Sequence, residues 1–270
     1  MLISIITVNL NNKEGLKRTT ESIIKQSFKD FEWLVIDGAS TDGSTSLIDQ
    51  HCSYWVSEED KGIYEAMNKG IAKAKGDFLL FLNSGDWLCS SNSLSQAQKT
   101  LQQPNADIYY CDVNFLDEQQ QIAWQKNYPQ EITIDFLLKS SLCHQAMFIK
   151  KEVFEHLGNY REKYRLSADW MFYFEALKKG FFFKKIENVR LTNFMLNGFS
   201  SNYILSKQER KDFISACYPE HLKEYLAITR NKTLIERVLI KLGQYLSLIE
   251  RPKQQRYYLK LKSGKQKAKG

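Results

Sequence analysis

Aspartates follow two apolar runs of this sequence, at the point where each run stops. Phe78–Leu82 ends at the polar sequence Asn83-Ser84-Gly85-Asp86, and the mostly apolar run Phe31–Ile36 ends at Asp37. Short apolar runs of this kind are typical of buried strands. Because ligands of an open α/β sheet bind beyond the carboxyl ends of its strands, we expect the two aspartates to share one site. A carboxylate there can hold a divalent cation, which in turn binds nucleotide phosphates.

A sheet has to position these residues, and the sequence before residue 115 predicts one. Strands are expected at 3–8, 31–36, 54–57 and 78–82, and helices after the capping residues Asn11 and Asn12 and at 46–51 and 62–75. Strand–helix alternation with short loops predicts a parallel sheet with right-handed crossovers. The later pattern is irregular, with strands expected at 108–113, 146–149 and 181–186 and helices near 152–157 and 169–179.

The composition is that of an ordinary globular protein, with 43% apolar and 26% charged residues in 270. The N-terminal sequence does not resemble a signal peptide, and no apolar stretch approaches the roughly 20 residues of a spanning helix. The five cysteines are odd in number and form no CxxC pair. We therefore expect reduced thiols, no zinc site and a cytoplasmic protein.

Positive charge is concentrated in the C-terminal segment. Residues 230–270 hold twelve Lys or Arg and two Glu, a formal charge of +10, which leaves −3 for residues 1–229. Apolar residues recur there at helical spacing: Leu234, Val238, Leu239, Leu242, Leu246 and Ile249. A basic amphipathic helix of this kind favours binding to an anionic membrane surface. The alternative is a helix packed on the body of the protein with a solvated charge run. Nucleic acid is not an expected partner, because no recognition motif is present.

Five segments, in order, resemble motifs of family 2 glycosyltransferases. They are Ile3–Asn12, Val35–Ser44, Asp60–Gly70, Asn83–Asp86 and Ser167–Trp170, within a resemblance that covers roughly residues 1–200. The resemblance implies the α/β fold called GT-A, with a mostly parallel central sheet flanked by helices, and sugar transfer with inversion. We expect a catalytic domain over 1–204, with a nucleotide-binding half at 1–115 and an acceptor half at 116–204. A helical, basic C-terminal extension would occupy 205–270.

The family motifs also imply roles for single residues. Asp86 would ligate Mg²⁺ or Mn²⁺, and Asp169 would be the base that deprotonates the acceptor hydroxyl. The nucleotide-binding set would be Val8, Asn9, Asn11, Asp37, Asp60 and Lys61. The acceptor and loop set would be His144, Trp170 and Gly198. Asn83–Asp86 offers one carboxylate where many relatives have two, which predicts weaker metal binding.

Each assignment has a structural alternative. Asp37 and Asp86 could be turn residues, and His144 could be a buried, hydrogen-bonded histidine. Asp60 and Asp169 could cap the helices that follow them. Asp42 is interpreted as a helix N-cap in preference to an Asx-turn residue. The segment 197–200 could be a plain turn in place of a loop that closes over the substrates.

The sequence predicts a glycosyltransferase that moves a sugar from a nucleotide-diphosphate sugar, with UDP expected on family frequency. The expected acceptor is a glycan or lipid-linked oligosaccharide at the inner face of the plasma membrane, in surface polysaccharide synthesis. Aromatic residues that could stack on sugars, although most are expected in the core, are Tyr109, Tyr110, Trp124, Tyr160, Tyr164 and Trp170.

Three other functions stay open from the residues. A sugar nucleotidyltransferase would need a glycine-rich, basic loop after the first strand, which Asn9–Lys13 does not supply. A non-catalytic nucleotide-sugar binding module would bind the donor without transfer. A membrane-surface scaffold would not need Asp37, Asp86 and Asp169 together.

Overall fold

The computed structural model describes residues 2–48, 52–117, 119–195 and 203–229. The chain divides into two compact units, Met1–Pro219 and Glu220–Gly270. The basic segment 230–270, with its predicted amphipathic helix, and the loop at 197–200 lie outside the described residues. None of the described helices is both long enough and apolar enough to cross a membrane.

The N-terminal half of the sheet is parallel, as the strand–helix alternation predicts. Its strands lie in the order β3, β2, β1, β4, and every neighbouring pair is parallel. Their bounds are β1 Ile3–Asn9, β2 Phe31–Asp37, β3 Tyr54–Ser57 and β4 Phe78–Phe81. β1, β2 and β4 are buried almost throughout, because helices cover both faces of this half.

The second half of the sheet mixes directions, and this is the part whose sequence pattern is irregular. The order continues β8, β6, β9, β5, with β7 pairing β6. Among the described strands of this half, β6 and β9 run parallel, and the other pairs are antiparallel. The bounds are β5 Trp87–Leu88, β6 Ile108–Leu116, β7 Ile122–Lys126, β8 Met147–Lys150 and β9 Phe183–Met195. β9 is much longer than the strand expected at 181–186.

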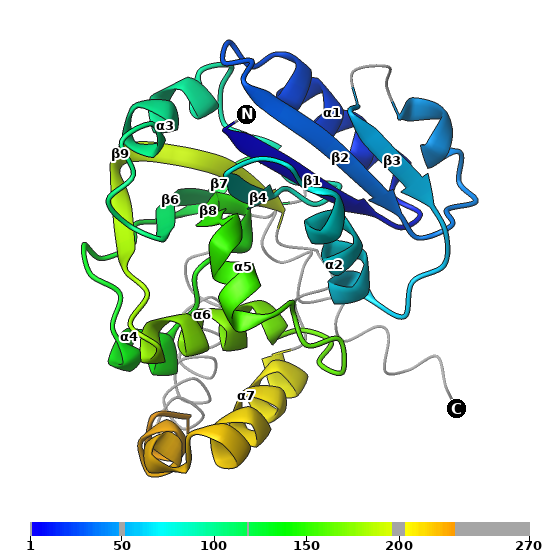
Figure 1. The fold of residues 1–270 in the computed structure, drawn as a ribbon. Coiled ribbons are helices and arrows are strands. Elements are labelled where there is room, and N and C mark those ends of the chain that lie inside the picture. The colour runs from blue at the N-terminus through cyan, green and yellow to red at the C-terminus, as the bar shows by residue number, and fades with distance from the viewer. Residues whose placement is uncertain (1, 49–51, 118, 196–202, 230–270) are drawn as a thin grey trace, which may run out of the picture. The chain divides into compact units, whose positions relative to one another are not determined.

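Two helices pack on opposite faces of the parallel half (Figure 1), as right-handed crossovers in both directions along the sheet require. α1 (Lys13–Ile24) begins at Asn12, whose side chain accepts from Gly15 N, so this predicted cap is confirmed. α2 (Ile63–Lys73) approaches β1 so closely at Gly70 that a Cβ there would lie 2.4 Å from Ile6 Cγ2. Glycine at this position therefore sets the depth at which α2 packs.

The remaining helices surround the second half. They are α3 Ser93–Leu101, α4 Ile134–Lys139, α5 Lys151–Leu157, α6 Ala168–Lys178 and α7 Tyr203–Cys217, with short 3-10 helices η1 Ser44–Leu47, η2 His144–Ala146 and η4 Pro219–His221. In place of the helix expected at 46–51, η1 ends before the extended Ile48. The first compact unit includes α7, where Phe213 packs edge-on against Trp170. The division at residue 204 stays a prediction.

Candidate active site

A row of polar side chains crosses the carboxyl end of the parallel strands. The strand register pairs Asn9 with Asp37, and Asp37 with Ser57. Asp37 Oδ1 accepts from Asn9 Nδ2 at 2.7 Å and Ser40 Oγ at 2.6 Å. Its Oδ2 accepts from Ser40 N at 2.9 Å and Ser57 Oγ at 2.6 Å. The carboxylate is fully buried, and four donors fill its hydrogen-bonding positions.

These donors keep Asp37 ionised. Burial raises the pKa of this carboxyl group, but hydrogen bonds from Ser40, Ser57 and Asn9 outweigh burial, and the net pKa lies below its ordinary value. The turn alternative is therefore partly correct, since Asp37 organises the loop at Ser40. A nucleotide base or ribose that bonds to Asp37 has to displace one of these donors.

The other predicted nucleotide residues lie around this row. Val8 and Asn9 are buried at the end of β1, and Val8 O accepts from Ser84 N at 3.0 Å. Asn11, in a left-handed conformation with φ 48°, joins the same loop, because Ser40 Oγ accepts from its backbone N at 2.8 Å. Lys61 is exposed, and its backbone N donates to Glu65 Oε2 at 2.7 Å.

Neither the capping alternative for Asp60 nor the preferred capping interpretation of Asp42 matches the structure. Asp60 does not cap α2, which begins after Gly62; its carboxylate pairs with Lys69 Nζ at 2.6 Å. Its Oδ2 would lie 3.3 Å from a Cβ at Gly38, so Asp60 stands beside the turn that follows Asp37. Asp42 forms an Asx turn, accepting from Ser44 N at 2.9 Å. It also accepts from the first backbone N of α1, at Lys13.

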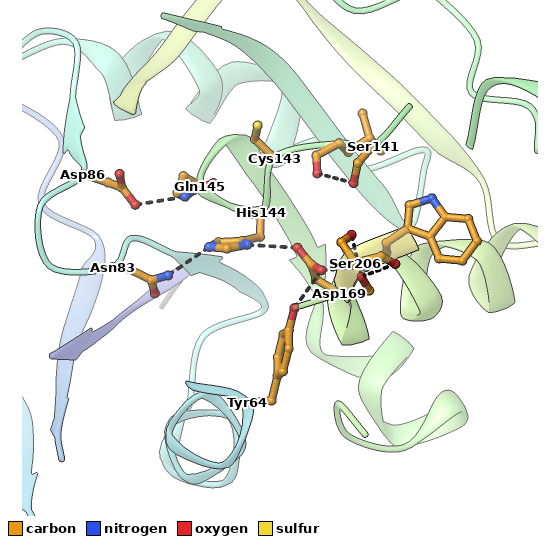
Figure 2. Close-up of polar contacts among 12 residues, drawn as sticks. Tyr64, Asn83, Asp86, Ser141, Cys143, His144, Gln145, Asp169 and Ser206 are labelled. Carbon is orange, nitrogen blue, oxygen red and sulfur yellow. Dashed lines mark hydrogen bonds and ion pairs between the residues drawn. The ribbon is translucent and has the colours of Figure 1, made fainter. Parts of the chain in front are cut away.

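Asp86 lies in the tight turn after β4. Gly85, with φ +104°, lets the chain turn, and Asp86 N donates to Asn83 O at 3.0 Å. The carboxylate is buried, and its Oδ2 accepts from Gln145 Nε2 at 2.9 Å (Figure 2). Burial raises the pKa of Asp86 to about 6, although the hydrogen bond from Gln145 acts in the opposite direction. Without a cation, the charged form of this group is destabilised.

Asp169 lies in the first turn of α6 and does not cap it, because the helix begins after Ser167. Its Oδ1 accepts from Tyr64 Oη at 2.9 Å and from Trp170 N at 2.8 Å. Its Oδ2 lies 3.1 Å from His144 Nδ1. Burial raises the pKa of this carboxyl group, but the hydrogen bonds from His144, Tyr64 and Trp170 N bring it below its ordinary value. Asp169 is therefore ionised, as a general base must be.

His144 lies between the turn that holds Asp86 and the carboxylate of Asp169. Its Nε2 lies 3.0 Å from Asn83 Nδ2, in the Asp86 turn, and its other ring nitrogen lies against Asp169. The next residue, Gln145, holds Asp86. Figure 2 shows this arrangement, in which one short segment, η2, touches both acidic groups. His144 is hydrogen-bonded on both sides, as the buried-histidine alternative expects, but it is only partly buried, and its role in the site stays a prediction.

Trp170 is a correction to the predicted acceptor set. Its ring is fully buried, and its Nε1 donates to Leu137 O at 2.8 Å, so it belongs to the core beneath the site. Gly198 lies outside the described residues. Among the predicted sugar-stacking aromatics, Tyr109, Tyr110 and Tyr160 are also buried, whereas Trp124 is about half exposed.

Sequence reasoning missed two residues of the site, Tyr64 and Gln145. Tyr64 lies 105 positions from the aspartate that it contacts, and Gln145 lies 59 positions from Asp86. The sequence near them gives one indication only: Tyr64 lies in the motif Asp60–Gly70, and Gln145 directly follows His144.

The described residues contain no cluster of three or more His, Cys, Asp or Glu side chains that could hold a metal alone. Asp86 still fits Mg²⁺ or Mn²⁺. Such ions are commonly bound through one or two carboxylates, with substrate phosphates and water completing the shell. A buried carboxylate with a raised pKa gains from a neighbouring cation.

A mostly parallel sheet with polar residues at its carboxyl edge, beside the strand-end carboxylate of Asp86 and the ionised carboxylate of Asp169, is typical of the GT-A class of nucleotide-diphosphosugar transferases. The model of the family "Glycosyl transferase family 2" matches residues 4–179. The chain belongs to this family, and its class of reaction is sugar transfer from a nucleotide sugar.

The chain is 28% identical, over 77% of its length and 82% of the relative's, to a PGL/p-HBAD biosynthesis glycosyltransferase of Mycobacterium bovis. Its fold resembles that of S. aureus TarS 1-349 in complex with UDP-GlcNAc, with a TM-score of 0.65 and 17% identity, covering 79% of this chain and 64% of that one. It also resembles the mannosyltransferase PcManGT of Pyrobaculum calidifontis in complex with GDP-Man and Mn²⁺, with a TM-score of 0.60 and 16% identity, covering 97% and 84%.

Proposed function

We propose that this protein is an inverting, metal-dependent glycosyltransferase that transfers a hexose from a nucleotide-diphosphate sugar to a hydroxyl group of an acceptor. The observation that carries the proposal is that two adjacent residues, His144 and Gln145, each contact one of two acidic groups. His144 holds Asp169, an ionised base, and Gln145 holds Asp86, a strand-end carboxylate suited to a cation.

The residues support a single displacement. Asp169 takes the proton of the acceptor hydroxyl group. The acceptor oxygen then attacks the anomeric carbon from the face opposite the leaving diphosphate. One such displacement inverts the configuration of that carbon. Asp86 would hold Mg²⁺ or Mn²⁺, which supplies positive charge to the departing nucleotide diphosphate. The buried row at Asn9 and Asp37 would orient the nucleoside.

We propose UDP as the nucleotide, which the complex of TarS with UDP-GlcNAc supports by analogy of fold. The mannosyltransferase neighbour is a complex with GDP-Man, so a GDP-sugar is the competing donor. We also propose a catalytic domain over residues 1–204, with a nucleotide-binding half at 1–115 and an acceptor half at 116–204. The C-terminal extension then covers residues 205–270.

We place the acceptor at the inner face of the plasma membrane, as a glycan or lipid-linked oligosaccharide in surface polysaccharide synthesis. The support is the charge of +10 within residues 230–270, which suits an anionic lipid surface. The mycobacterial relative carries the name of a PGL/p-HBAD biosynthesis enzyme.

A donor panel tests the proposal. Purified protein with Mn²⁺ is incubated with UDP-, GDP- and dTDP-sugars, and release of nucleotide diphosphate is measured. We expect release from one donor, lost with EDTA and in Asp86→Ala and reduced at least about 100-fold in Asp169→Asn. The matched control is Asp135→Asn, whose carboxylate is 56% exposed and pairs only with Lys139 in the described part of the chain.

Two results would contradict the proposal. Donor binding by calorimetry without any transfer, also with acceptor lipids added, would identify a non-catalytic binding module. Absence of metal-dependent nucleotide binding together with absence of release would exclude the transferase mechanism.

A further inference from the structure

We propose that Tyr64 and His144 are positioning residues that orient the Asp169 carboxylate so that its Oδ2 atom receives the acceptor proton. The inference rests on the proposed function, because it assumes that Asp169 is the base. It assigns the proton to one of two chemically identical oxygens, and it gives a task to a tyrosine on the nucleotide-binding half of the sheet.

The two oxygens of Asp169 differ in the donors that they already have. Oδ1 accepts from Tyr64 Oη at 2.9 Å and from Trp170 N at 2.8 Å, so both of its lone-pair positions are filled. Oδ2 has one donor among the described residues, His144 Nδ1 at 3.1 Å. One lone pair of Oδ2 is therefore open, and the side chain is 14% exposed, which leaves an approach for a hydroxyl group.

Tyr64 is a rigid donor. The residue is 4% exposed, and its ring packs against that of Tyr160 with centroids 5.5 Å apart. Burial and the neighbouring Asp169 charge raise the pKa of the Tyr64 phenol well above its ordinary value, so it keeps its proton. Because α2 fixes Tyr64, the hydrogen bond fixes the rotation of the Asp169 carboxylate about its last side-chain torsion.

Asn83 determines which nitrogen of His144 carries the proton. With Asn83 Nδ2 donating to Nε2, that nitrogen is the acceptor, and a ring hydrogen lies on Nδ1, facing Asp169. This assignment follows from the hydrogen-bond network. His144 Nδ1 thus supplies a donor to Oδ2 of Asp169.

The proton transfer balances without a further reactant. The acceptor O–H bond breaks and its proton passes to Oδ2, while the acceptor oxygen forms a bond to the anomeric carbon. The bond from that carbon to the diphosphate oxygen breaks, and its electron pair leaves with the nucleotide diphosphate.

Other titratable groups near Asp169 stay neutral. Tyr160 and Tyr173 have pKa values raised well above their ordinary values by burial. Burial also raises the pKa of the Cys143 thiol. Of the described side chains that face Asp169, Tyr64 and His144 are therefore those that lower its pKa through donated hydrogen bonds, beside the backbone N of Trp170.

The first test is spectroscopic and needs no substrate. Long-range proton–nitrogen spectra report the tautomer of each of the four histidines, and His144→Asn assigns the signal of His144. We expect the Nδ1–H tautomer. Carboxyl-carbon NMR, with Asp169→Asn for assignment, should show that the pKa of Asp169 lies below its ordinary value in the wild type and is higher in Tyr64→Phe than in the wild type. An Nε2–H tautomer, or an unchanged Asp169 titration in Tyr64→Phe, would overturn the proposal.

The second test is kinetic, with the sugar nucleotide that the wild type hydrolyses. Tyr64→Phe should lower kcat about 10- to 100-fold, leave the donor KM within about threefold, and move the acid limb of kcat/KM to higher pH. His144→Asn keeps an amide nitrogen near the Nδ1 position and should retain more activity than His144→Leu. The control is Tyr110→Phe, which loses a buried hydroxyl group bonded to Pro129 O and Gln130 O.

The outcomes separate the two proposals. A Tyr64→Phe variant with a lowered Tm but unchanged kcat and acid limb would make Tyr64 structural, and the positioning inference would fail alone. Full activity in Asp169→Asn would instead overturn the proposed function.

Discussion

Three aspartates of this chain have the same side chain but different environments, and the environment decides what each can do. Asp37 is saturated by hydroxyl and amide donors, which keep it charged and fixed. Asp169 is charged too, but its Oδ2 atom has only one donor among the described residues, which leaves a lone pair open. Asp86 is destabilised in its charged form by burial. These environments support the proposed roles, in which Asp37 organises the nucleotide-binding loop, Asp169 accepts a proton and Asp86 binds a cation.

Gln145 should control the metal affinity of Asp86. Gln145→Leu removes the Nε2 donor at 2.9 Å, so the pKa of Asp86 should rise further above about 6 and Mn²⁺ should compete less well with a proton. Loss of such a supporting contact typically lowers metal affinity about 10- to 100-fold. Calorimetric titration of Mn²⁺ in the presence of UDP at pH 7 measures this directly.

The control is Gln125→Leu, on the exposed strand β7. Equal Mn²⁺ affinity in Gln145→Leu and the wild type would show that Asp86 is not the metal ligand, or that Gln145 does not orient it. In the wild type, affinity should fall as the pH drops below about 6, where Asp86 takes up a proton.

At the scale of elements, the sequence predicted the parallel strands well because each is a short apolar run with turn residues behind it. β9 was underestimated because its later residues alternate with charged and polar ones, and it is held by its pairing with β6 over residues far away in the sequence. The contacts of Asp60 with Lys69 and of Tyr64 with Asp169 are of the same kind. Local patterns carry no information about such partners.

α2 should transmit packing changes to the site. In Gly70→Ala the new Cβ would lie 2.4 Å from Ile6 Cγ2, so α2 has to move away from β1. Overpacking of this kind costs about 1–3 kcal/mol of stability. Because Tyr64 moves with the helix, kcat should fall more than donor binding. Urea denaturation and donor hydrolysis measure the two effects.

A double-mutant cycle separates this effect from a general loss of stability. Ile6→Ala removes the Cγ2 atom, so the double variant should be more stable than the sum of the single changes predicts. Simple additivity of the two free-energy changes would show that the clash at Gly70 is relieved in some other way.

At the scale of the whole molecule, negative and positive charge are concentrated in different parts of the chain, and the candidate active site does not depend on the positive part. Residues 1–229 carry −3 and residues 230–270 carry +10. The polar residues Asn9 and Asp37 and the carboxylates of Asp86 and Asp169 all lie within the first compact unit. A catalytic function for this unit and a membrane-binding function for the basic segment can therefore be tested separately.

Halving the net charge of the basic segment, from +10 to +5, should strongly weaken binding to anionic vesicles without affecting catalysis. The full-length variant replaces five lysines by glutamine: Lys260, Lys262, Lys265, Lys267 and Lys269. Each basic residue near an anionic surface contributes about 1 kcal/mol, so partition onto phosphatidylglycerol vesicles should fall more than about 100-fold. Sedimentation with vesicles measures the partition, and donor hydrolysis without lipid should stay unchanged.

The control replaces five exposed lysines of the first unit by glutamine: Lys17, Lys25, Lys29, Lys73 and Lys99. It removes the same number of positive charges. If the position of the charge matters, vesicle binding should stay largely intact; if only the net charge matters, binding should fall as much as in the first variant. Binding of the wild type should also weaken in high salt, because ions screen an exposed charge interaction. Wild-type binding to neutral phosphatidylcholine vesicles that equals binding to the anionic ones would exclude the electrostatic mechanism.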